Sequence, residues 1–177
     1  MIYLIIASVL LVVSYVGITI WGLKGLPDSI SAMVYVLPRQ GQWVWIVWMW
    51  VASLCVCIPL IGVMPDTLRF LGFITLACLM LCGAMPISSS TTNKKWHDWL
   101  GIAGGILSQV CVVFVSPWWL TAWMLWPFLM GSTIIQPEGG DMRRLFKGKG
   151  VFVAEMICFL VLTGALVEYF MFNNLKI

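Results

Sequence analysis

Long apolar stretches separated by short polar segments form the main pattern along the chain. Six stretches have roughly the 20 apolar residues that a helix needs to cross a hydrocarbon core about 30 Å thick. They cover residues 2–23, 43–63, 70–87, 99–115, 118–134 and 151–172. Because lipid offers no hydrogen-bond partner to the backbone, each stretch must be helical. The pattern predicts an all-α transmembrane bundle, one domain over residues 1–177, with six spans and short loops.

The boundary between the fourth and fifth spans depends on a proline. Only Ser116 and Pro117 separate the two stretches. Pro117 ends the helix, because its ring clashes with the preceding turn and its nitrogen carries no proton. We therefore expect a tight hairpin between two spans rather than one long helix.

The first apolar stretch is expected to be a true span rather than a cleaved signal peptide. No basic segment precedes it, and no small-residue cleavage site follows it. Between it and the second span, residues 28–37 are predicted to form a short helix in the membrane interface. Asp28 or Ser29 would cap this helix, and its apolar residues recur at helical spacing. An extended loop is the alternative.

The composition supports a membrane protein and excludes several other classes. Apolar residues make up 62% of the chain and charged residues only 10%, which does not suit a water-soluble globule or a nucleic-acid groove. The six cysteines lie inside apolar runs, where free cysteine behaves as a small hydrophobic residue. A disulfide framework is therefore not expected.

The basic residues predict how the chain is oriented. Eight of them fall in the three loops that follow the first, third and fifth spans: Lys24, Arg39, Lys94, Lys95, Arg143, Arg144, Lys147 and Lys149. Arg69 and Lys176 belong to the opposite face. Cytoplasmic loops carry the excess of lysine and arginine, so both termini are predicted to lie outside. The basic loop with Arg143, Arg144, Lys147 and Lys149 is also a candidate surface for anionic lipid or an acidic partner.

Charged groups inside a span are functional candidates, because their burial in lipid is costly. Glu155 lies about one turn into the last span, within reach of Arg143, Arg144 or water. A role in function and a role as an interfacial acid are both open for it. Glu168 lies near the outer end of the same span and is interpreted as an interfacial acid.

The single histidine limits the metal chemistry available to one chain. His97 alone makes neither a histidine pair for haem nor the usual zinc sites. Cys78 and Cys82 share one helix face, but packing accounts for them better than a metal. We therefore expect no metal and no other cofactor.

A catalytic site at the cytoplasmic interface is one hypothesis from the sequence. Ser31, His97 and Asp98 are expected at similar depth, with Glu155 slightly deeper. Histidine can act as a base and a carboxylate can fix its tautomer, so Ser31 would be the nucleophile or a ligand. The alternative is that any interfacial region collects such residues.

The fourth span contains small and polar residues that predict close helix packing. Gly101 and Gly105 form a G-x-x-x-G face, which lets helix backbones approach closely. Ser108 and Gln109 follow near the middle of the bilayer and need hydrogen-bond partners there. They are interpreted as contacts between helices, with a ligand contact as the alternative. Pro59 and Pro127 interrupt the second and fifth spans, as prolines do in some transporters.

Three local patterns carry a resemblance to known proteins. "SISAMVYVL", "CGAMP" and "WHDWLGIAGGILSQV" resemble an uncharacterised group of small six-span membrane proteins from gut bacteria and their phages. This resemblance implies a six-span fold in a bacterial inner membrane and no particular activity. A serine with a His-Asp pair is more distantly similar to ceramidase-like membrane hydrolases, which bind zinc. The later histidine pair of those enzymes is absent from this sequence.

These observations favour a non-catalytic membrane module that oligomerises or joins a larger complex and contacts membrane lipid, with a small-solute or ion pathway as an extension. A lipid-directed hydrolase or transferase with Ser31, His97 and Asp98 is the first alternative. An accessory protein whose basic loop docks anionic lipid or an acidic partner is the second.

Overall fold

The chain folds as a bundle of long helices. The computed structural model describes residues 1–31, 34, 37–85, 91–135 and 148–174. Five helices in this part are long and apolar enough to cross a membrane: α1 (Ile2–Leu23), α2 (Gln42–Val63), α3 (Arg69–Ala84) with the short 3₁₀ turn η3 (Asp66–Leu68) before it, α4 (Thr91–Val115) and α7 (Gly150–Asn174). The all-α membrane bundle predicted from the sequence is confirmed.

The remaining predicted span consists of two kinds of helix. Residues Pro117–Met124 form a 3₁₀ helix, η4, and Leu125–Ile135 form the α-helix α5. Pro117 begins η4, where its missing N–H costs nothing. With rises of about 2.0 and 1.5 Å per residue, the two segments together reach about 32 Å, close to the thickness of a hydrocarbon core.

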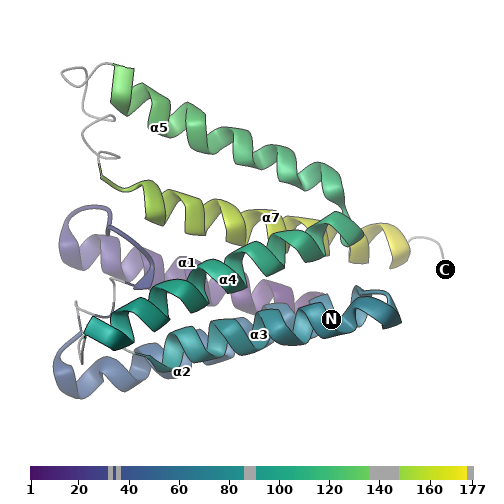
Figure 1. Cartoon of the computed structure of the whole chain (residues 1–177), viewed down its shortest axis with the longest axis horizontal. Helices are drawn as coiled ribbons and strands as arrows, with labels where there is room; N and C mark the ends of the chain where they lie inside the picture. The colour runs from purple at the N-terminus through teal and green to yellow at the C-terminus, as the bar shows by residue number, and fades with distance from the viewer. Residues whose placement is uncertain (32–33, 35–36, 86–90, 136–147, 175–177) are drawn as a thin grey trace.

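Figure 1 shows how the helices are arranged. The rods run up and down the bundle, and the start of α1 and the end of α7 lie toward the same end. Helix α3 packs against both α2 and α4, while α7 contacts α4, η4 and α1. The rod made by η4 and α5 lies on the outside of the bundle (Figure 1). There α5 packs mainly against η4 and α7.

Two boundaries differ from the prediction. Helix α4 begins at Thr91 rather than at residue 99, because the polar residues before the apolar run continue the helix beyond it. Helix α3 ends at Ala84, and residues 86–87 of the predicted span lie outside the described part. Helix α2 continues through Pro59, which is buried, so this proline does not interrupt the span.

The predicted interfacial helix over residues 28–37 is not seen as an α-helix in its described residues. Asp28 to Ile30 form bends and a turn, and Ser31 and Val34 have 3₁₀ conformation, while residues 32, 33, 35 and 36 are outside the description. Val34 is almost completely buried in the core. The segment is drawn into the bundle by its apolar side chains and by contacts with α7.

The core is apolar and closely packed. Its fully buried members come from several helices: Ile5, Leu60, Val112, Val161 and Leu166. Ser8 is also buried, and its hydroxyl donates to the carbonyl of Ala52 at 3.2 Å, which joins α1 to α2. The six cysteines are free, as the sequence predicts.

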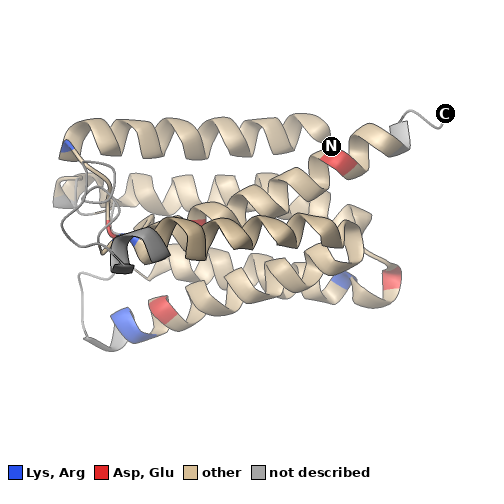
Figure 2. Ribbon diagram, turned by 90° about the horizontal axis from the view of Figure 1, so that it is seen from above, with Lys and Arg blue, Asp and Glu red and all other residues tan. Residues whose placement is uncertain are grey.

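The charged residues gather toward the two ends of the bundle (Figure 2). Lys24, Lys94, Lys95 and Lys149 belong to the loops and helix ends at one end. At the other end, Arg69 pairs with Asp66 at 2.8 Å. This distribution, with the five long apolar helices, identifies a membrane protein.

Candidate functional site

Four clusters of polar side chains in the described part of the chain contain the residues that the sequence marked as candidates or that bond to them. The first joins the loop after α1 to the beginning of α7. The carboxylate of Glu155 accepts a hydrogen bond from the backbone N–H of Ile30 at 2.5 Å. The carbonyl of Asp28 accepts from the N–H of Phe152 at 3.1 Å, and the Asp28 carboxylate pairs with Lys149 at 2.5 Å. Glu155 therefore positions a loop.

This cluster gives Glu155 a partner that the sequence did not predict, while the expected partners in the basic loop stay untested. Glu155 bonds to the backbone of Ile30, while Arg143 and Arg144 lie outside the described residues. Lys147 is outside them as well, so docking through this loop stays a prediction. Asp28 caps α7 through its carbonyl and does not begin an interfacial helix.

Ser31 lies on this clamped loop. Its hydroxyl and that of Ser29 are 2.9 Å apart. Because Ile30 bonds to Glu155, Ser31 and Glu155 are brought to the same end of the bundle. The loop and α7 thus place these two candidate residues near one another.

The second cluster is built around His97, which is only 4% exposed. Its Nδ1 lies 2.9 Å from the carbonyl oxygen of Cys82 and 3.1 Å from that of Met85. Carbonyl oxygens only accept, so Nδ1 carries the proton and donates. The Nε2 atom is 3.7 Å from the Cys82 thiol.

His97 thus closes the C-terminal end of α3, whose last carbonyls have no partner within the helix. Within the described part of the chain, no hydrogen bond joins His97 to Ser31 or Asp98, and Asp98 is exposed. The sequence predicts a similar depth for Ser31, His97 and Asp98, but it does not indicate that the imidazole of His97 faces α3.

The third cluster lies in the middle of the bundle and joins α4 to α7 and η4. The amide nitrogen of Gln109 donates to the carbonyl of Cys158 at 3.2 Å and lies 3.0 Å from its thiol. The amide oxygen accepts from the indole N–H of Trp123 at 2.9 Å. Ser108 donates to the carbonyl of Gly105 at 2.7 Å. The contacts made by both polar residues are between and within helices of this chain.

The glycines of α4 serve the same packing. An added Cβ at Gly101 would lie 3.5 Å from the Cys82 sulfur on α3, and one at Gly105 would lie 3.9 Å from the Cys158 sulfur on α7. At Gly104 it would meet Leu79 at 3.0 Å. The G-x-x-x-G face is therefore used within the chain.

The fourth cluster was not foreseen from the sequence. The carboxylate of Glu168 accepts hydrogen bonds from the hydroxyl of Ser116 at 2.8 Å and from the indole N–H groups of Trp118 and Trp119 at 2.8 and 2.6 Å. These contacts hold the beginning of η4 against α7. The sequence "SPWW" at residues 116–119 could have indicated this cluster, because indoles at a membrane interface need acceptors for their N–H groups.

Comparison with known proteins adds no further residues to these clusters. No family model matches the sequence, and neither the curated proteins nor the solved structures gave a match. The interpretation of the four clusters therefore depends on their geometry alone.

Proposed function

We propose that this protein is a non-catalytic membrane module that associates with a second copy or with another membrane protein through the outer face of α1. The polar residues of the bundle support a non-catalytic protein, because their bonds join elements of its own chain. These residues are Glu155, His97, Gln109 and Glu168.

One feature of α1 carries the proposal. Ser14 and Gly17 lie near the middle of this helix and are exposed, and nothing lies within 4 Å of a Cβ built on Gly17. Leu10 and Trp21 continue the same face at helical spacing. Small residues allow two membrane helices to approach closely, and a serine hydroxyl gains a partner across such an interface.

Association through α1 also agrees with the filled interior of the bundle. Apolar side chains from α1, α2, α4 and α7 occupy it. A pathway for a small solute or ion, if the module forms one, is therefore expected between chains rather than within one.

The experiment compares the parent chain with Gly17→Leu in lipid nanodiscs. The leucine fills the space beside α1 without meeting any atom of its own chain, so the fold is expected to persist. The parent should run as an oligomer or with a co-purifying membrane protein, and Gly17→Leu should run as a single chain. Light scattering coupled to size exclusion gives the mass of each.

The matched control is Ala77→Leu, which adds the same side chain at an exposed position of α3. It should leave the assembly unchanged. A parent chain that is strictly monomeric and free of partners would contradict the proposal. Equal assembly of the parent and Gly17→Leu would exclude α1 as the interface.

A further inference from the structure

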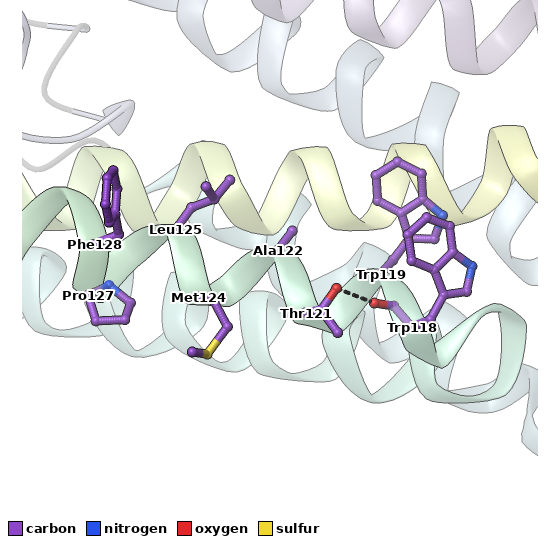
Figure 3. A pocket seen from close by; sticks show the side chains of 8 residues that line it. All are labelled: Trp118, Trp119, Thr121, Ala122, Met124, Leu125, Pro127 and Phe128. Carbon is purple, nitrogen blue, oxygen red and sulfur yellow. Dashed lines mark hydrogen bonds between the residues drawn. The ribbon is translucent and has the colours of Figure 1, made fainter.

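A shallow apolar hollow of about 780 Å³, open to the outside of the bundle, lies along η4 and α5 (Figure 3). Trp118 and Trp119 stand together at one end of it, and Phe128 stands at the other. The helix rise between Trp118 and Phe128 is about 18 Å, close to the roughly 15 Å of hydrocarbon in one leaflet. The hollow therefore has the length and the apolar walls that suit a lipid chain.

The two tryptophans that line one end of the hollow are bonded to an anionic group on α7, which lies beside the hollow. The indole N–H groups of Trp118 and Trp119 both point to the carboxylate of Glu168. Their rings lie 4.8 Å apart, and Trp118 is 54% exposed. Among the described residues no lysine or arginine pairs with Glu168, whose bonds are to neutral donors.

A carboxylate beside an exposed indole ring is the chemistry that binds an ammonium group. Aromatic faces attract cations, most strongly at tryptophan, and the carboxylate adds a direct charge interaction. The pair formed by Trp118 and Glu168 lies at one end of an apolar hollow about one leaflet long. A phospholipid carries both parts in one molecule, an acyl chain and a charged headgroup.

We propose that the hollow along η4 and α5 binds a phospholipid with an ammonium headgroup, phosphatidylethanolamine, whose acyl chain lies against Phe128 and Leu125. The ammonium lies over the exposed face of Trp118, whose N–H edge is bonded to the carboxylate of Glu168, so it is close to that negative charge. The negative charge of Glu168 selects this headgroup over an anionic one. The site is formed by η4, α5 and Glu168 of α7, and it does not depend on association through α1.

The experiment counts lipids bound to the purified full-length chain by native mass spectrometry. The chain is titrated in detergent with phosphatidylethanolamine or with phosphatidylglycerol of identical acyl chains. The parent should bind phosphatidylethanolamine about tenfold more tightly, as expected for one cation–π contact and one charge interaction at a partly exposed site.

Two variants separate the headgroup end from the acyl end. Glu168→Gln keeps an oxygen that accepts from an indole and removes the charge, so the preference between the two lipids should disappear. Phe128→Ala leaves the Glu168 cluster intact and removes a wall of the hollow, so both lipids should bind more weakly while the preference remains. Phe73→Ala, at an exposed position of α3, is the matched control and should change neither.

Thermal unfolding of each variant verifies that the chain is folded before lipids are counted. Equal binding of the two lipids to the parent would overturn the proposal. So would a Phe128→Ala variant that binds lipid as Phe73→Ala does. A third result would also overturn the proposal: a dimer of the parent that is lost in Phe128→Ala while lipid binding is unchanged. The hollow would then be the contact surface for a second copy of the chain.

Discussion

His97 illustrates how single polar residues act in this bundle. Its imidazole is buried and donates to two carbonyl oxygens, those of Cys82 and Met85. The next residue, Asp98, is exposed. The two neighbours thus differ in surroundings although the sequence presents them as one His-Asp motif.

Replacement of His97 by alanine is expected to destabilise the protein. The change removes a buried donor from two carbonyl oxygens, which costs about 1–3 kcal/mol. Asp98→Ala is the control and should stay within about 0.5 kcal/mol of the parent, because the side chain is exposed. Titration with SDS in mixed micelles measures the free energy of unfolding. A stable His97→Ala variant that had lost a lipid-hydrolysing activity would instead support the catalytic hypothesis.

Gly164 of α7 shows a steric requirement at a single position. A Cβ at this residue would lie 2.4 Å from the ring of Trp119. Gly164→Ala is therefore expected to destabilise the protein by about 1–3 kcal/mol, the range for overpacked sites, although alanine is the better helix former. Gly17→Ala, with open space around it, should be neutral or slightly stabilising. The same unfolding titration compares the two, and equal stability would contradict the close approach of Trp119 to α7.

The sequence allowed some of these residue roles to be predicted. The contacts of Ser108 and Gln109 between helices followed from the need of an amide in lipid for partners. The partners of Glu155 and Glu168 did not follow, since Ile30 is 125 residues from Glu155 and the indoles are about 50 residues from Glu168. Such distant pairs depend on how whole helices are placed, and periodicity within one helix does not encode that placement.

At the scale of elements, the apolar runs predicted the existence of the helices more accurately than the residues at which they begin and end. Four spans agree with the described helices to within a few residues, whereas α4 starts at Thr91 because a helix can continue past the lipid. The 3₁₀ conformation of η4 could not be predicted, since hydropathy does not distinguish it from an α-helix. The contacts of Trp118, Trp119 and Trp123 with neighbouring helices hold this segment in place.

A double-mutant cycle tests how η4 is attached to α4. Gln109→Leu and Trp123→Phe each remove one partner of the hydrogen bond between the side chains. The coupling free energy should be about 0.6 and at most about 1.7 kcal/mol, as for polar pairs in membrane helices. Gln109→Leu combined with Trp126→Phe is the control pair, because Trp126 donates to Gly150 instead. That pair should be additive within about 0.5 kcal/mol, and coupling of equal size in both pairs would contradict the contact.

At the scale of the whole molecule, the orientation in the membrane is the main expectation still to be measured. The described cations at one end of the bundle belong to the loops after the first, third and fifth spans. The start of α1 and the end of α7 lie toward the opposite end (Figure 1). The rule for cytoplasmic charges therefore predicts an external position for both ends of the chain.

Single cysteines outside the helical core test this orientation in intact bacterial cells. A membrane-impermeant thiol reagent should label Asp66→Cys in intact cells, and it should label Lys94→Cys only after lysis. The native cysteines lie within the helices, so the parent chain gives the background. Labelling of Lys94→Cys in intact cells would reverse the orientation, and labelling of both positions from one side would contradict the arrangement of the spans.

The eight residues of η4 make this span longer than an α-helix of the same sequence. Rewinding Pro117–Met124 from 3₁₀ to α conformation would shorten it by about 4 Å, with no change in sequence. That difference is close to the range of thickness among cellular membranes, so the 3₁₀ conformation suits this span to a thicker bilayer than an α-helix of the same residues would. The contacts of η4 with α7 and α4 thus fix the bilayer thickness that this span matches.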